Sequence, residues 1–214
     1  MANRLEGPNT FTGTNTFSGT LVLPSDISGN GKWPVVNMAQ RVLSHFQLPL
    51  QDARIWDAPQ TPLPTTSATD DLGLTIGTFG TSGILIQTSD LKTVTATRYC
   101  RWPQVVVPHN YEAGESILVR LFAGMDTTVS DTTATIDVEA YVTDGIGGVS
   151  ADKCTTAAQD MNTLTDANLD FELGTTLVPG DILDIRVAIA VADVATGTAV
   201  IANIGRAYLV CDCQ

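Results

Sequence analysis

The chain has 214 residues, 43% of them hydrophobic, so it is long enough and apolar enough to bury a core and is not a disordered protein. Its formal net charge of -12 comes from 11 basic and 23 acidic side chains. Such a protein repels phosphate backbones and anionic lipid surfaces, so we expect neither nucleic acid nor a membrane as partner.

The charge lies almost entirely in the second half. Residues 1–101 carry seven basic and seven acidic side chains, and the remaining four basic and sixteen acidic ones lie in residues 102–214. This predicts a near-neutral N-terminal part followed by an acidic, water-facing domain. The N-terminus has no apolar signal-peptide core, and no apolar run reaches membrane-spanning length, so we expect synthesis in the cytosol.

Residues 9–20 are two copies of a six-residue unit, Asn-Thr-Phe-Thr-Gly-Thr and Asn-Thr-Phe-Ser-Gly-Thr. Six is even, so in an extended chain Asn9, Phe11, Asn15 and Phe17 share one face. A single ribbon of this kind has too small an apolar face to fold alone. We therefore predict that residues 1–35 form an extended N-terminal arm whose repeat side chains contact other copies or a larger assembly. The alternative is a low-complexity tail with an accidental repeat.

Residues 36–68 are predicted to hold one short helix and a proline-rich linker. The helix is expected from Asn37 to Phe46, because Asn37 is a suitable cap and apolar side chains recur at four-residue steps. Proline is then frequent around an isolated Trp56, which is typical of a linker or strapping arm. Trp33 and Trp56 precede or lie beside proline-rich or linker chain and are candidate docking anchors.

Residues 69–214 are predicted to form an acidic, jelly-roll-like antiparallel β-sandwich, so the expected fold class is all-β. The clearest strand follows the turn Pro179-Gly180-Asp181, and its apolar side chains alternate on one face: Leu183, Ile185, Val187, Ile189 and Val191. We interpret it as the central strand of the sandwich. Its other face begins with Asp184 and Arg186 and continues with alanines, which suggests a second layer or a neighbouring subunit over its far end.

The remaining strand candidates are short and separated by turn residues. A helical turn or two is expected within Asp152–Met161. The strands are expected over residues 72–79, 83–88, 93–98, 102–107, 116–123, 135–142, 168–173 and 199–211.

No arrangement of residues singles out a catalytic, cofactor or metal site. His109 lies in a loop without a nucleophile elbow, and Glu112 and Glu115 are explained by a solvated turn. The carboxylates considered for calcium lack the dense spacing of a calcium loop: Asp126, Asp131, Asp181 and Asp184. The cysteines match no common zinc framework and are interpreted as free thiols that are mostly buried: Cys100, Cys154, Cys211 and Cys213.

The hexapeptide pair resembles the Asn-x-Phe-x-Gly repeats in the N-terminal anchoring parts of tailed-bacteriophage head and tail fibres. The acidic sandwich, with its turns Ala113-Gly114-Glu115 and Pro179-Gly180-Asp181, is similar to the jelly-roll domains of phage capsid cement, or decoration, proteins. The resemblance implies a homotrimer on the outer capsid surface of a virion, bound to the major capsid protein. The presence of only two repeats favours a short anchor over a long fibrous shaft.

Three functions follow as hypotheses. The leading one is a non-enzymatic cement protein that bridges capsomers and so stabilises the phage head. The alternative is the receptor- or glycan-binding head of a short fibre, because jelly rolls often carry lectin sites. A tailspike enzyme would need two placed carboxylates that the sequence does not single out.

Overall fold

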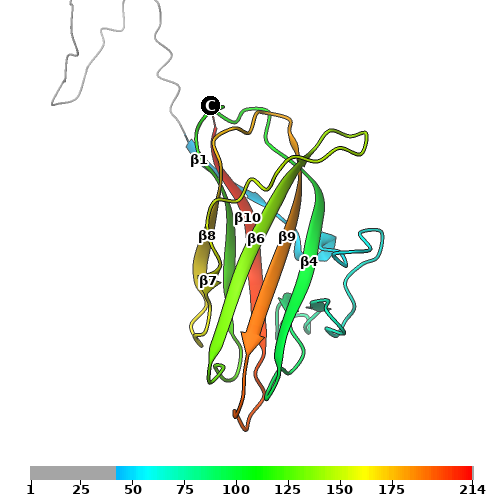
Figure 1. Cartoon of the computed structure of the whole chain (residues 1–214), viewed down its shortest axis with the longest axis vertical. Helices are drawn as coiled ribbons and strands as arrows, with labels where there is room; N and C mark the ends of the chain where they lie inside the picture. Colours follow the sequence, from blue (N-terminus) through cyan, green and yellow to red (C-terminus); the bar gives the residue numbers. More distant parts are fainter. Residues whose placement is uncertain (1–41, 214) are drawn as a thin grey trace, which may run out of the picture. The chain divides into compact units, whose positions relative to one another are not determined.

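The computed structural model describes residues 42–213, and the candidates Asn9, Phe11, Asn15, Phe17 and Trp33 lie outside this range. Within it the chain is all-β apart from one 3₁₀ turn, Leu50–Asp52 (Figure 1). The strands are β1 Val42–Gln47, β2 Gly73–Thr75, β3 Leu85–Gln87, β4 Thr95–Val106, β5 Ile117–Met125, β6 Thr133–Thr143, β7 Gln159–Asp160, β8 Ala167–Leu173, β9 Ile182–Ala192 and β10 Ala202–Cys213.

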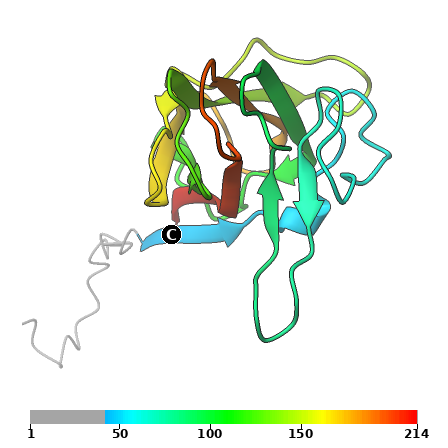
Figure 2. The same ribbon diagram turned by 90° about the horizontal axis from the view of Figure 1, so that it is seen from below.

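The strands form two antiparallel sheets that pack face to face as a jelly-roll-like sandwich. The larger sheet has six strands in the order β2-β3-β10-β5-β8, with β1 paired to the other end of β10. The smaller sheet has four strands in the order β4-β9-β6-β7. Figure 1 shows β6, β9 and β4 in front of β10, and Figure 2 shows the two layers end-on. The predicted β-sandwich is confirmed.

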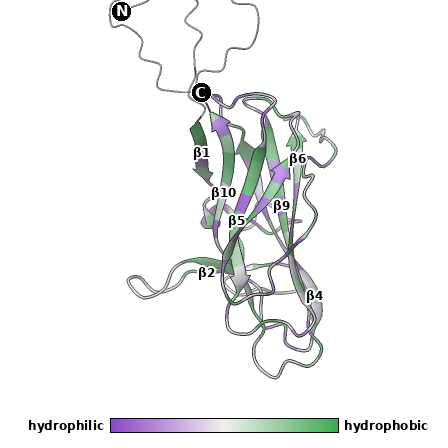
Figure 3. Cartoon of the chain, turned by 90° about the vertical axis from the view of Figure 1, so that its left-hand side faces the viewer, coloured by the Kyte–Doolittle hydropathy of each residue, from purple (hydrophilic) through white to green (hydrophobic). Residues whose placement is uncertain are grey.

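The core lies between the sheets and is built by alternation along the strands. The five apolar side chains of β9 predicted to face inward, Leu183 to Val191, are all at most 1% exposed. They pack with equally buried side chains of the facing sheet, such as Val119, Leu121 and Phe171. Strand β9 lies between β4 and β6, so its prediction as a central strand is confirmed. Figure 3 shows the hydrophobic character of these inner strands.

Strand β4 is a single strand where the sequence suggested two. Its pairing with β9 is interrupted by a register shift between Trp102 and Val105, and Gln104 has a positive φ of 59°. Pro103 cannot donate a ladder hydrogen bond, so the bulge accommodates it within the strand. The bulge lies within the predicted strand 102–107, whereas the predicted gap at residues 99–101 is regularly paired with β9.

The expected helix from Asn37 to Phe46 is wrong over its described part, because Val42–Gln47 is strand β1, paired antiparallel with β10 from Tyr208 to Cys213. The four-residue spacing of apolar side chains is compatible with a helix. The segment is nevertheless a strand, because it pairs with the distant strand β10. The helical turn expected within Asp152–Met161 is likewise absent: Cys154 forms a β-bridge to Leu173, and β7 pairs with β6.

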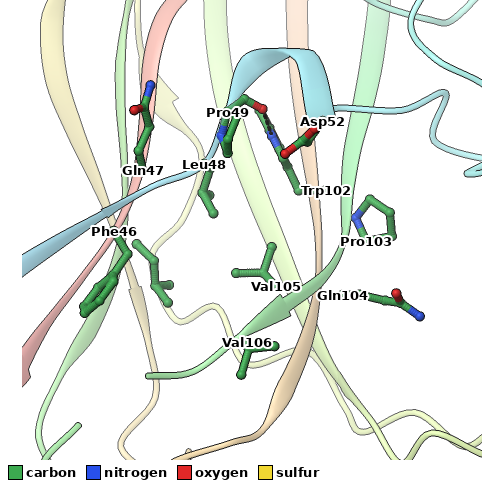
Figure 4. Close-up of a pocket in the computed structure, with 11 residues that line it drawn as sticks. Phe46, Gln47, Leu48, Pro49, Asp52, Trp102, Pro103, Gln104, Val105 and Val106 are labelled. Atoms are coloured by element: carbon green, nitrogen blue, oxygen red, sulfur yellow. Dashed lines mark hydrogen bonds between the residues drawn. The ribbon is translucent and has the colours of Figure 1, made fainter. Parts of the chain in front are cut away.

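The proline-rich segment after β1 folds onto the sandwich. Leu48, Leu50, Ala53 and Leu63 are buried in the common core, and the Trp102 indole N–H donates to the Pro49 carbonyl over 2.9 Å (Figure 4). A hollow of about 270 Å³ lies beside this contact, between the end of β1 and the bulge of β4. The segment therefore has a fixed course, which places its Trp56 against the smaller sheet.

Candidate functional site

The outer face of the four-stranded sheet carries a row of polar and aromatic side chains. Alternation turns Asp184 and Arg186 of β9 outward, because their neighbours Leu183, Ile185 and Val187 fill the core. The cross-strand register places Arg186 opposite Arg101 of β4 on one side and opposite Glu139 of β6 on the other. Polar side chains of three adjacent strands thus meet on one surface.

Two ion pairs order this surface. Arg101 donates through both Nε and Nη2 to the Asp184 carboxylate, with 2.5 Å between Nε and Oδ1. Arg186 pairs with Glu139 over 2.5 Å between Nη2 and Oε2, and both side chains are 30% exposed. The Arg101–Asp184 pair is bidentate and therefore has one preferred geometry, which fixes the hydrogen-bonding groups of these two side chains.

Trp56 covers one side of the row. Its indole N–H donates to Asp70 Oδ2 over 3.0 Å, and its backbone carbonyl accepts from Arg101 Nη1 over 3.3 Å. Its ring lies 5.2 Å from the Tyr99 ring, at an interplanar angle of 46°. The Arg186 guanidinium lies 5.2 Å from the Trp56 centroid and 5.0 Å from that of Tyr99, so a cation–π contact joins strand and loop.

A groove of about 360 Å³ runs between Trp56 and the end of β6. Its lining includes Trp56 and Asp57, and Tyr141 and Val149. The charged side chains of the two ion pairs, Arg101, Asp184, Arg186 and Glu139, complete its lining. An adjoining hollow of about 500 Å³ shares Arg101 and Asp184 with this groove. We call the two together the outer groove.

Carboxylates around the groove make its electrostatic potential negative. Burial raises the pKa of the Asp137 carboxyl above its ordinary value, and the carboxylates of Glu139 and Asp152 add to the rise, although the Val138 N–H opposes it. Burial also raises the pKa of the Tyr141 phenol, to which Glu139 and Asp152 contribute. Tyr141 therefore remains protonated near neutral pH and can donate a hydrogen bond.

Of the six contact residues predicted from sequence, the structure describes only Trp56, and it lies in the groove. The sequence did not identify Arg101, Glu139 or Tyr141, because what brings them together is strand register. One signal was present: the charged start of the outer face of β9, Asp184 and Arg186, which forms part of the groove lining. The alanines that follow on this face are half-buried.

Two of the carboxylates weighed for calcium, Asp131 and Asp181, have hydrogen-bond partners within the protein. Asp131 accepts from the N–H groups of Val194 and Ala195, and Asp181 accepts from the Val178 N–H. In the described part of the chain no group of three His, Cys, Asp or Glu side chains is placed to hold a metal ion. Residues 42–213 also contain no helix with the length and apolarity needed to cross a bilayer.

Comparison with known proteins shows similarity only at the level of folds. No family model and no curated protein matches this chain. Among solved structures, the xylan-binding module CBM15 is 10% identical, with 80% of this chain and 97% of that one covered and a TM-score of 0.39. The CBM22-1 xylan-binding domain of Paenibacillus barcinonensis Xyn10C is 9% identical, covering 80% and 98%, with a TM-score of 0.36. TmCBM61, solved with β-1,4-galactotriose, is 13% identical, covering 61% and 72%, with a TM-score of 0.36.

Proposed function

We propose that the outer groove binds a neutral glycan and that the sandwich is a binding domain. The observation that carries this proposal is that two aromatic side chains and two ion pairs line one groove. Trp56 and Tyr141 are the aromatic members of this lining. The C–H faces of a pyranose ring are apolar, and aromatic rings offer them a large, flat contact surface.

The lining of the groove suits the hydroxyl groups of a sugar. Guanidinium groups donate in a fixed fork and carboxylates accept, and here each group is already oriented by its ion pair. Side chains ordered before binding lose less conformational entropy when a ligand arrives. A glycan hydroxyl can donate to Glu139 or Asp184 while accepting from Arg101 or Arg186.

Charge favours a neutral ligand over an acidic one. Three carboxylates line the 360 Å³ groove: Asp57, Glu139 and Asp184. The two guanidinium groups in its lining are already ion-paired with Glu139 and Asp184. Asp137 and Asp152 lie close by and add negative potential. A polysaccharide rich in uronic or sialic acid would meet like charge here, which lowers both its affinity and its rate of association.

The arrangement supports binding without cleavage. Glycoside hydrolysis needs one carboxyl group that holds a proton for the leaving group and a second that acts as base or nucleophile. Glu139 and Asp184 are each ion-paired with an arginine, so neither carboxylate is an unpaired group available for these two roles. We therefore propose that the protein leaves its glycan intact.

A glycan array tests the ligand class. The full chain, labelled at an exposed amine, is applied to neutral and acidic oligosaccharides at two salt concentrations. The proposal expects retention on neutral glycans that changes little with salt. Retention only on acidic glycans, or on none, would contradict it.

The N-terminal repeat supports a second, compatible proposal: a virion-surface role as a capsid cement protein, as its resemblance to phage fibre anchors implies. A homotrimer and binding to the major capsid protein are part of that proposal. Co-sedimentation of the full chain with phage heads tests it, with a Phe11→Ala/Phe17→Ala variant as comparison. Equal binding by both chains would contradict a role for the repeat.

A further inference from the structure

The two hollows of the outer groove follow one another along β6. Glu139 and Tyr141 line the groove of about 360 Å³, and Thr143, at the next outward position, lines the hollow of about 500 Å³. From Glu139 to Thr143 the strand rises about 13 Å, at about 3.3 Å per residue. Arg101 and Asp184 belong to both linings, so the two hollows adjoin. The outer groove is therefore longer than a single sugar ring.

The larger hollow has a different lining from the groove beside Trp56. The residues that it does not share with that groove are all uncharged: Pro59, Gln60, Pro103, Gln104 and Thr143. A glutamine amide both donates and accepts hydrogen bonds, and so does a threonine hydroxyl. Gln60 and Gln104 are exposed, so their amides are open to a ligand. This end of the outer groove offers hydrogen-bonding groups without adding charge.

The bulge in β4 determines the position of Gln104. Figure 4 shows Gln104 beside Pro103 at this bulge. The φ of 59° at Gln104 is left-handed, which is unfavourable for a residue with a side chain, and a glycine would adopt it without strain. Bulges redirect side chains beside binding sites, and strained residues gather at such sites. The strained backbone at this position thus carries an amide that lines the larger hollow.

We propose that the outer groove binds at least two consecutive units of a linear neutral glycan, and that Gln60 and Gln104 bind the second unit. This inference rests on the proposed glycan binding and specifies its ligand. The first sugar unit contacts Trp56 and Tyr141, and the next unit lies beyond Asp184, against the two amides. Because the two hollows share Arg101 and Asp184, they hold neighbouring units of one ligand and not two separate ligands.

The length of the glycan distinguishes this arrangement from a site for one sugar. A ligand that reaches both hollows gains the contacts of its second unit without a second loss of translational and rotational freedom. Affinity should therefore rise steeply when a monosaccharide is extended to a trisaccharide. A site confined to Trp56 and Tyr141 would bind ligands of every length with similar affinity.

The test measures binding of a length series by the full chain. The probes are the mono-, di- and trisaccharide of the neutral glycan that the array retains most strongly. Isothermal titration measures the longer probes, and NMR titration, which detects weak binding, measures the monosaccharide. The variant Gln60→Ala/Gln104→Ala removes both amides from the larger hollow. Gln51→Ala is the matched control, because Gln51 is an exposed glutamine that lines neither hollow.

The wild type and Gln51→Ala should bind the trisaccharide about 10-fold or more tightly than the monosaccharide. Gln60→Ala/Gln104→Ala should lose about 10-fold in affinity for the trisaccharide, because two hydrogen-bonding groups are removed, and should bind the monosaccharide like the wild type. Circular dichroism and thermal unfolding verify that this variant is folded. If it is not, Gln60→Ala/Gln104→Gly applies the same test with a residue suited to the left-handed backbone.

Two results would overturn this inference and leave the proposed glycan binding in place. One is equal affinity of the wild type for all three probes. The other is a folded double variant that binds the trisaccharide like the wild type, or that loses the same affinity for the monosaccharide as for the trisaccharide. A wild type that binds no neutral glycan on the array would overturn both proposals.

Discussion

Arg186 and Glu139 lie directly opposite each other on β9 and β6, and their side chains form an ion pair with 2.5 Å between Nη2 and Oε2. The same guanidinium lies over the rings of Trp56 and Tyr99. Arg186 therefore connects the central strand of the smaller sheet with the loop whose Trp56 lines the groove. This contact holds a segment without regular structure at the proposed binding surface.

Arg186→Met should loosen the groove with a small cost in stability. The pair is partly solvated, so losing the ion pair and the cation–π contact should lower the free energy of unfolding by about 1 kcal/mol, measured by urea denaturation. Glycan affinity should fall about 10-fold or more, because Trp56 loses its support. Arg206→Met is the control, since Arg206 stacks on Phe122 in the other sheet. Equal effects of both variants on affinity would contradict the role given to Arg186.

Ile185→Ala should destabilise the sandwich by about 2–5 kcal/mol, because Ile185 is 0% exposed and the shortened side chain leaves a cavity. Ile146→Ala makes the same chemical change at a side chain that is 92% exposed and should cost less than about 0.5 kcal/mol. Urea denaturation measures both. A similar decrease in the free energy of unfolding for the two variants would contradict the assignment of Ile185 to the core.

Asp193 should make the free energy of unfolding depend on pH in the acid range. Burial alone would raise its pKa, but hydrogen bonds from the Thr196 hydroxyl and from the N–H groups of Thr93 and Asp131 outweigh burial and lower the pKa to about 2. The folded pKa is thus below the unfolded value, so this contribution to stability is present above about pH 5 and is lost as the pH falls toward 2.

Asp193→Asn should therefore lower the midpoint of thermal unfolding at pH 7 more than at pH 3. Glu112→Gln alters a carboxylate in a turn that is distant in sequence from Asp193, and it should show no such difference. An unchanged acid dependence in Asp193→Asn would contradict the assignment.

The thiols should be nearly inert in the folded protein. Cys100, Cys211 and Cys213 are buried and free, and burial raises the pKa of Cys211 to about 12. Burial also raises the pKa of the half-buried Cys154 to about 11. A thiol reagent at pH 8 should react slowly, with one thiol at most, and with all four after denaturation. Rapid reaction of two or more thiols in the native protein would contradict this burial.

The sequence predicted those parts of the fold that depend on the residue pattern within one strand, and not those that depend on pairing between strands. Alternation identified β9, because its branched apolar side chains all lie on one buried face. It failed for β1, whose side chains are mostly exposed and whose conformation depends on pairing with β10. It also showed β4 as two strands, over residues 93–98 and 102–107, although residues 99–101 pair with β9 without a register shift.

The candidate site was predictable only in fragments. Trp56 was recognised as an isolated aromatic residue beside prolines, and Asp184 and Arg186 as charges on a strand face. Their association with Arg101 and Glu139 depends on the register of β4, β9 and β6, which no local pattern encodes.

Isothermal titration of a neutral oligosaccharide from the array tests the glycan-binding groove most directly. Trp56→Ala should weaken binding about 10-fold or more, because it removes an aromatic side chain from the lining of the groove. Phe79→Ala removes an aromatic side chain that is fully exposed in the loop between β2 and β3, and it should bind like the wild type. Wild-type affinity in a folded Trp56→Ala variant would contradict the proposed site.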